Sequence, residues 1–167
     1  MPGEASFFER FLSTDQDRTL LFQRLILGIV MFPHGAQKLL GWFGGFGFSG
    51  TMGFFTGTMH IPSPIAFLII IAESLGAIGL IVGLGTRLAA LGIAAVMVGA
   101  VLTTHTSVGF FMNWLGTQKG EGFEYHLLAL ALALPLIVRG GGLLSLDGAL
   151  VNRLRSGGAP VAHPSRA

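Results

Sequence analysis

Residues 32–50, which read FPHGAQKLLGWFGGFGFSG, decide how this chain folds. The stretch closes a long apolar run with His34, Gln37 and Lys38, and it continues into a loop rich in glycine and aromatic residues. On a helix, residues three and four apart share one face, so these three side chains point the same way. Hydrocarbon tolerates such groups only where neighbouring segments supply partners. We therefore predict that this face points inward, toward protein.

The composition is that of a membrane protein. Of the 167 residues, 51% are hydrophobic and only 11% are charged, and the mean hydropathy is +0.72. The ten Lys and Arg residues are scattered rather than gathered in a patch, which argues against a nucleic-acid partner. The absence of cysteine excludes disulfides, thiolate metal sites and dithiol exchange. The expected partner of most of this surface is the lipid bilayer.

Four apolar runs predict an all-α membrane protein, an antiparallel four-transmembrane-helix bundle with an outer loop rich in glycine and aromatic residues. The runs cover about residues 19–41, 62–83, 86–105 and 123–138, and the loop covers 41–64. We expect three regions: a cytoplasmic N-terminal segment at 1–18 that can form an interfacial helix, the transmembrane domain at 19–139, and a cytoplasmic interfacial segment with a disordered tail at 140–167. No cleavage site for a signal peptide follows the first run.

The distribution of arginine predicts the orientation. If both termini are cytoplasmic, one side holds seven arginines and the opposite loops hold Lys119 alone; the arginines are Arg10, Arg18, Arg87, Arg139, Arg153, Arg155 and Arg166. Cytoplasmic loops carry such an excess of positive charge. The prediction is a multi-pass protein of the cytoplasmic (inner) membrane with both termini inside. Arg24, near the start of the first run, is expected to act mainly as an anchor that reaches the interface.

In this orientation, polar residues from three helices converge near the outer face. They are Lys38, His105, Glu124 and His126, while Glu73 lies deeper, near the middle of its helix. A lone carboxylate at that depth costs about 2.5–3.5 kcal/mol, so Glu73 should be protonated or paired with Lys38 or His34. Such a pair can hold helices together or serve a functional site. The histidine spacing does not favour a metal site.

Several motifs together make the chain resemble the DoxX family, over about residues 18–147. The most specific is the stretch from His34 to Leu39 with the loop after it; the others are Arg24 with Leu25 and Gly28, Gly53-Phe-Phe, Glu73 with Gly76, residues 85–90, His105 before Gly109-Phe-Phe, and Glu124-Tyr. The resemblance implies a small four-helix membrane protein, and many relatives are called oxidoreductases by similarity. The family takes its name from a subunit associated with thiosulfate:quinone oxidoreductase and terminal quinol oxidase. Its polar signature falls on Arg24, His34, Gln37, Lys38, Glu73, Arg87, His105 and Glu124.

Polar pocket and resemblance together predict a quinone-linked redox component that works with a partner oxidoreductase. His34, Glu73 and His105 are the candidate catalytic groups for proton transfer. The candidate ligand-binding residues are Gln37, Lys38, Trp42, Phe43 and Glu124. No covalent cofactor is expected, and because no flavin, haem or iron–sulfur motif is present, electrons are expected from the partner. The alternative is a non-catalytic membrane subunit, or a protein that binds or transports a small hydrophobic ligand; the sequence leaves the oligomeric state open.

Overall fold

The computed structural model describes residues 7–157, and all regular structure in that range is helical. This confirms the predicted all-α class for those residues, whereas the start of the N-terminal segment and the predicted disordered tail lie outside them. The elements are α1 (Phe7–Leu12), α2 (Arg18–Leu40), the 3-10 turn η1 (Trp42–Gly44), α3 (Gly47–Gly53), the π-helical η2 (Phe54–Thr58), α4 (Ser63–Val82), α5 (Thr86–Ala100), the π-helical η3 (Val101–His105), α6 (Glu124–Arg139) and α7 (Leu146–Gly157).

Three of these helical segments are long and apolar enough to cross a membrane. They are Arg18–Leu40, Ser63–Val82 and Thr86–His105, the last formed by α5 and η3 together. Helix α6 has 16 residues, fewer than the roughly 20 that usually span the hydrocarbon core. Many large apolar side chains on these helices are exposed, among them Phe22, Ile26, Ile29, Ile78, Leu91 and Leu128. Such a surface suits hydrocarbon rather than water.

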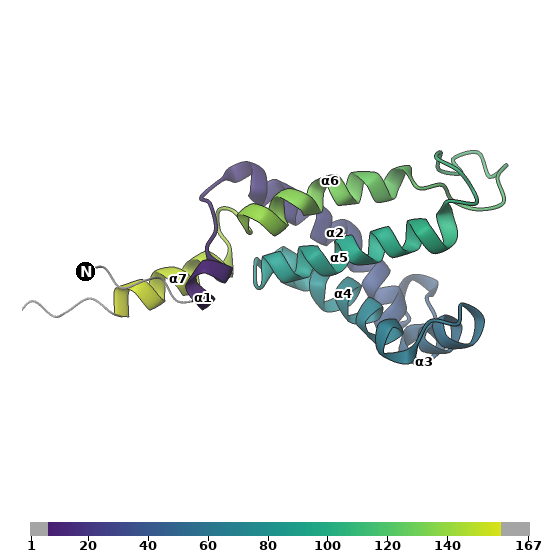
Figure 1. The fold of residues 1–167 in the computed structure, drawn as a ribbon, viewed down its shortest axis with the longest axis horizontal. Coiled ribbons are helices and arrows are strands. Elements are labelled where there is room, and N and C mark those ends of the chain that lie inside the picture. The colour runs from purple at the N-terminus through teal and green to yellow at the C-terminus, as the bar shows by residue number, and fades with distance from the viewer. Residues whose placement is uncertain (1–6, 158–167) are drawn as a thin grey trace, which may run out of the picture.

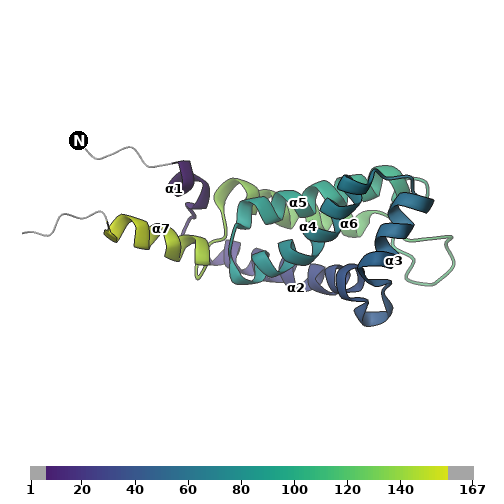
Figure 2. The ribbon, with the colours of Figure 1, turned by 90° about the horizontal axis from the view of Figure 1, so that it is seen from below.

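Helices α2, α4, α5 and α6 lie side by side along the molecule (Figures 1 and 2). Helix α2 packs against α4 and α6, and α5 packs against the same two helices. Their shared interior holds buried apolar residues from all four, among them Leu27, Met31, Leu80, Ile93 and Leu136. A Cβ built on Gly35 would lie 2.5 Å from the Glu73 carbonyl oxygen, so only glycine permits this approach of α2 to α4.

Helix ends are set by local sequence signals and, at the start of α5, by a side chain from far along the chain. The Asp17 side chain accepts a hydrogen bond of 2.7 Å from the Thr19 N–H and caps α2, which ends at Gly41 in the left-handed conformation. The turn from α4 to α5 uses left-handed Gly83 and Gly85. The N-terminus of α5 is capped from far along the chain, because the Asp147 carboxylate accepts hydrogen bonds from the N–H groups of Gly85 and Thr86.

The segment between α2 and α4 is largely helical. Predicted as an outer loop rich in glycine and aromatic residues, it contains η1, α3 and η2 in succession. It folds back on α2, since a Cβ on Gly45 would meet the Gln37 carbonyl oxygen at 2.3 Å. Figure 1 places α3 at the end of the molecule opposite α1 and α7, the same end as the connection between η3 and α6.

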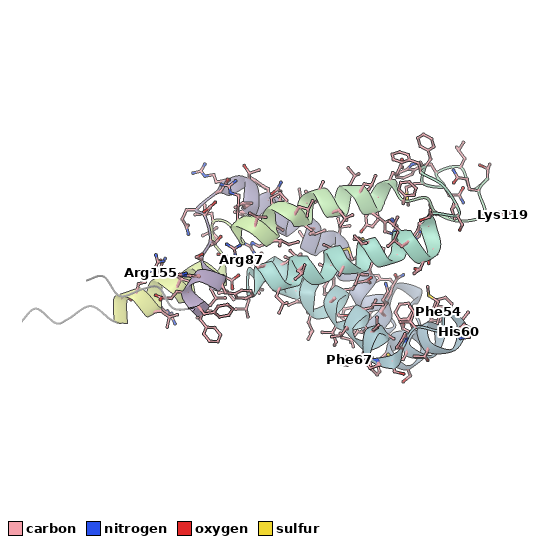
Figure 3. The ribbon with its side chains drawn as sticks, in the orientation of Figure 1. Phe54, His60, Phe67, Arg87, Lys119 and Arg155 are labelled. Atoms are coloured by element: carbon pink, nitrogen blue, oxygen red, sulfur yellow. The ribbon has the colours of Figure 1, made fainter. Side chains whose placement is uncertain are left out.

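Arg24 is not an interfacial anchor, which corrects the prediction from sequence. Its side chain is 1% exposed and donates hydrogen bonds to five backbone carbonyls, those of Leu80, Ile81, Gly141, Leu143 and Leu144. The glycine-rich stretch after α6 folds over the start of α2 and supplies three of these acceptors. Figure 3 shows Arg87 and Arg155 toward this end of the molecule and Lys119 and His60 toward the other.

Candidate functional site

The centre of the candidate site is an ion pair between two membrane-spanning helices. Lys38 Nζ of α2 lies 2.5 Å from Glu73 Oε2 of α4, and 5% of the Glu73 side chain is exposed against 23% for Lys38. The sequence named Lys38 and His34 as the nearest partners for this carboxylate, and the lysine fills that role. Within residues 7–157, this oxygen has no conventional hydrogen-bond partner beyond the ion pair.

The close packing of α2 on α4 positions this pair. Gly35 allows the two backbones to touch, and the Ser74 hydroxyl donates a hydrogen bond of 3.0 Å to the Gly35 carbonyl. On α4, Glu73 directly precedes Ser74. On α2, His34 directly precedes Gly35, and Lys38 follows Gly35 by three residues, which is less than one helical turn. The glycine therefore fixes how far the carboxylate of one helix lies from the polar side chains of the other.

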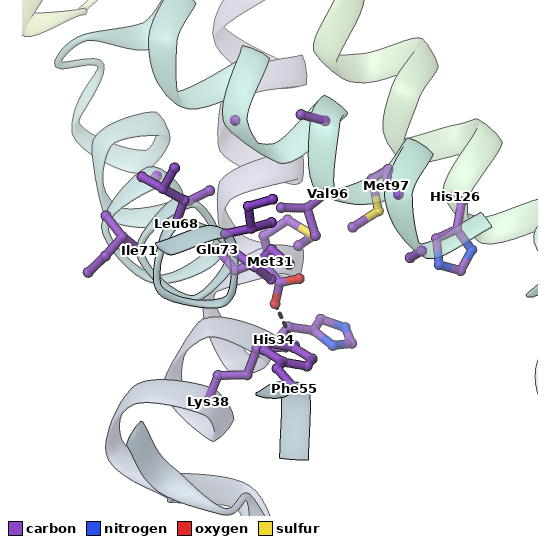
Figure 4. A pocket seen from close by; sticks show the side chains of 18 of the residues that line it. Met31, His34, Lys38, Phe55, Leu68, Ile71, Glu73, Val96, Met97 and His126 are labelled. Carbon is purple, nitrogen blue, oxygen red and sulfur yellow. Dashed lines mark ion pairs between the residues drawn. The ribbon is translucent and has the colours of Figure 1, made fainter. Parts of the chain in front are cut away.

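The ion pair lines a cavity of about 1220 Å³ between α2, α4, α5, η3 and α6. Pockets for small ligands commonly measure about 300–1,000 Å³, so this one has room for a substantial molecule. Figure 4 shows Glu73 directed toward Lys38, with His34 beside the pair and His126 on the far side of the cavity. Its polar lining is gathered at one end and includes His34, Lys38, Glu73, His105, Tyr125 and His126.

Aromatic and imidazole rings surround the polar end. The ring centroids of His34 and Tyr125 lie 6.0 Å apart, and those of His105 and His126 lie 4.2 Å apart. The Tyr125 hydroxyl contacts Met31 Sδ at 3.3 Å, and His105 Nδ1 lies 2.7 Å from the Glu121 carbonyl oxygen. His105 stands in the π-helical η3, an irregular form that is frequent at functional sites.

The structure brings together some predicted site residues and not others. All three candidate catalytic groups, His34, Glu73 and His105, line the cavity with Lys38. The other candidate ligand-binding residues do not line it. Gln37 donates to the Phe43 carbonyl, Trp42 and Phe43 are 53% and 63% exposed, and Glu124 accepts a hydrogen bond from the Trp114 indole N–H.

Tyr125 and His126 line the polar end of the cavity but were missing from the sequence-based set of candidates. Tyr125 was noted only as part of a motif, and His126 only as one of the polar residues near the outer face. In the structure His126 is 7% exposed, and its Nδ1 has no hydrogen-bond partner among the described residues. The available signal was helical spacing, because His126 lies two residues after Glu124 and so faces a different side of α6.

This arrangement offers hydrogen-bond donors, proton carriers and apolar walls in one space. Lys38 provides an ammonium, Glu73 a carboxylate, and the histidines ring nitrogens that can donate or accept a hydrogen bond or a proton. Among residues 7–157, no set of three or more His, Asp or Glu side chains is arranged to hold a metal ion. The chemistry that these side chains support is hydrogen bonding and proton transfer.

Comparison with known proteins identifies the class of this chain. The DoxX family model matches residues 19–106. The chain is also 31% identical, over 127 residues, to a Bacillus subtilis (strain 168) protein named "Putative oxidoreductase CatD"; the match covers 76% of this chain and 83% of that protein. No solved structure matches the chain.

The chain belongs to the DoxX family, as the resemblance implied, and is a membrane protein. The family match covers α2 to η3, the segments that carry Lys38, Glu73 and His105. Helix α6, with Tyr125 and His126, follows that region and completes the cavity.

Proposed function

We propose that this protein is a quinone-linked redox component that binds the quinone head at the polar end of the cavity and works with a partner oxidoreductase. The observation that carries the proposal is the pairing of the buried Glu73 carboxylate with Lys38, in one cavity with four histidines and a tyrosine. Charged side chains within membrane-spanning segments usually mark functional sites, such as proton relays or ligand-binding sites. The name of the Bacillus subtilis relative, "Putative oxidoreductase CatD", supports a redox role.

The reaction requires both electrons and protons. Reduction of a quinone to its quinol takes up two electrons and two protons, one proton on each carbonyl oxygen, and oxidation releases them. The Lys38 ammonium can donate a hydrogen bond to one carbonyl oxygen, and His126, whose Nδ1 has no hydrogen-bond partner within residues 7–157, can bond the other. Glu73, His34 and His105 carry protons between the head and the nearby surface. The partner oxidoreductase supplies or accepts the two electrons.

The same proposal includes the membrane arrangement. Helix α6 acts as the fourth crossing, because it packs beside α2 and α5 along the bundle. Residues 19–139 form the transmembrane domain, with interfacial segments on either side. The end that holds Arg18, Arg87 and Arg139 faces the cytoplasm of the inner membrane, together with both termini.

Accessibility labelling tests this orientation. The wild-type chain has no cysteine, so single cysteines give a clean background. A cysteine at the exposed position Ser49 should react with an impermeant thiol reagent added to intact cells, and one at the exposed position Ser156 should react only after the cells are opened. The reverse pattern would place the polar end of the cavity on the cytoplasmic side.

The binding site is tested with a short-chain ubiquinone or menaquinone analogue and protein in lipid nanodiscs. The wild type should bind the analogue saturably. Lys38→Ala or His34→Ala should weaken binding at least tenfold, about 1.4 kcal/mol. The matched control is Lys119→Ala, which removes an exposed lysine that does not line the cavity. Absence of saturable binding, or equal binding by all variants, would refute the quinone site.

A second function is favoured by the ion pair itself. Lys38 and Glu73 neutralise each other within the protein. In this second function, the role of the pair is to hold α2 against α4. The protein would then be a non-catalytic subunit, or would bind or transport a small hydrophobic ligand in the largely apolar cavity. Copurification of a soluble oxidoreductase with quinone-free protein would support this alternative.

A further inference from the structure

The cavity continues far beyond its polar end, along the seam between α4 and α5. The lining residues recur every three or four positions along each helix. On α4 they are Ile65, Leu68, Ala72, the pair Leu75 and Gly76, and Gly79; on α5 they are the pair Leu88 and Ala89, Gly92, the pair Ala95 and Val96, and Gly99. From Ile65 to Gly79, at 1.5 Å per residue, the lined length of α4 is about 21 Å. This apolar extension, which we call the α4–α5 groove, is longer than a quinone ring requires.

The α4–α5 groove opens toward the lipid. Leu68, Leu75 and Leu88 all line it, and their side chains are 61%, 54% and 64% exposed at the surface of the protein. Because these positions lie on helices long and apolar enough to span the membrane, the opening meets hydrocarbon. Small residues such as Gly76 and Gly92 keep the floor of the groove low.

A buried ring nitrogen at the polar end has no hydrogen-bond partner in the part of the chain that the structure describes. His126 lines the cavity and is 7% exposed, and its Nδ1 is unbonded within residues 7–157. A buried polar atom in this state favours a ligand that completes its hydrogen bonding. A stripe of small residues alone would fit a second protein helix equally well, but an unsatisfied polar group at one end of an apolar groove points to a ligand with two chemically different halves.

We propose that the ligand is an isoprenoid quinone with a long tail, which enters sideways from the bilayer and lays that tail in the α4–α5 groove while its head reaches His126 and the Lys38–Glu73 pair. The proposal rests on the proposed function for the identity of the head. The position of the tail follows separately from the groove. Entry from the lipid requires no water-filled channel, because head and tail both move within the membrane.

The test uses a quinone whose tail carries a photoreactive diazirine, bound to protein in nanodiscs. Ala95→Phe places a ring in the groove from an exposed position of α5. The matched control is Val98→Phe, three residues further along α5, which is 44% exposed and does not line the groove. Binding of a tailless quinone, measured on the same samples, reports on the head alone.

In the wild type, the diazirine should label the groove-lining residues of α4 and α5. Ala95→Phe should reduce this labelling at least fivefold and leave tailless quinone binding unchanged, and Val98→Phe should alter neither. Labelling spread evenly over all lipid-facing helices, or insensitive to Ala95→Phe, would overturn the proposal. So would efficient crosslinking between two copies through Leu88→Cys, which would mean that a second copy occupies the groove.

Failure of the proposed function gives a different result. If the tailless quinone does not bind, a fatty acid with a diazirine at a matching chain position tests the groove by itself. Groove labelling by the fatty acid, again lost in Ala95→Phe, would retain a long-chain ligand there and reject only the quinone head. Absence of both signals would overturn the groove assignment as well.

Discussion

Removing one partner of the Lys38–Glu73 pair should destabilise the protein nearly as much as removing both. Glu73→Gln leaves the Lys38 ammonium beside a neutral amide, and Lys38→Met leaves a carboxylate whose side chain is 5% exposed without its cation. Loss of one partner from a buried pair costs about 3–5 kcal/mol. Lys38 is 23% exposed and partly screened by its surroundings, so we expect about 2 kcal/mol for Glu73→Gln and about 3 kcal/mol for Lys38→Met.

The double variant removes both charges and should lose about 3 kcal/mol, which leaves a coupling free energy of about 2 kcal/mol. This magnitude separates an ion pair from an ordinary hydrogen bond. Double-mutant cycles of interhelical hydrogen bonds in a membrane protein average about 0.6 kcal/mol and reach about 1.7 kcal/mol. The four proteins are compared by unfolding in mixed micelles with increasing SDS, followed by the helical circular dichroism signal.

The control cycle pairs Lys38→Met with Ile78→Ala. Ile78 lies on the same helix as Glu73, is 45% exposed and does not line the cavity. Its effect should add to that of Lys38→Met within about 0.5 kcal/mol. A Lys38–Glu73 coupling below about 0.5 kcal/mol, or Glu73→Gln as stable as the wild type, would mean that Glu73 is neutral and would refute the ion pair.

Two further predictions concern the end of the molecule that holds Arg24. Arg24→Lys should lower the free energy of unfolding by about 3 kcal/mol or more in the same SDS assay, because one ammonium cannot reach carbonyls on both α4 and the segment after α6; a loss under about 1 kcal/mol would contradict this role. The Thr19 N–H holds the pKa of Asp17 below its usual range, so this cap contributes stability above the unfolded-state pKa and loses it as the pH falls through the lower folded-state pKa. Acid unfolding below about pH 4 should therefore be less steep in Asp17→Asn, which keeps the cap without the charge; identical acid limbs would show that Asp17 does not contribute.

The helices of this fold follow from local sequence features. The lengths of the apolar runs predicted three spanning segments within a few residues of their observed ends. The ends were predictable because glycines such as Gly41 and Gly83 adopt the left-handed conformation that terminates a helix. The pairing of Glu73 was also predictable, since an intramembrane carboxylate needs a partner and few cations lie at its depth.

Contacts between distant segments were not predictable in this way. The burial of Arg24 depends on the Gly140–Gly142 turn, which brings carbonyls from the far end of the chain over the start of α2. The cavity position of His126 depends on the rotation of α6 about its axis, which helix packing sets. Gln37 shared a predicted face with His34 and Lys38, but its side chain turns to the Phe43 carbonyl instead.

The central claim is that a quinone head at the polar end of the cavity exchanges protons with Glu73 and its neighbours. The most direct measurement is the infrared difference spectrum between oxidised and reduced quinone in nanodiscs that contain the protein. We predict quinone carbonyl bands shifted from those in empty nanodiscs, together with a carboxyl band that is absent in Glu73→Gln and retained in Lys119→Ala. Quinone bands identical to those in empty nanodiscs, with no carboxyl change in the wild type, would contradict the claim.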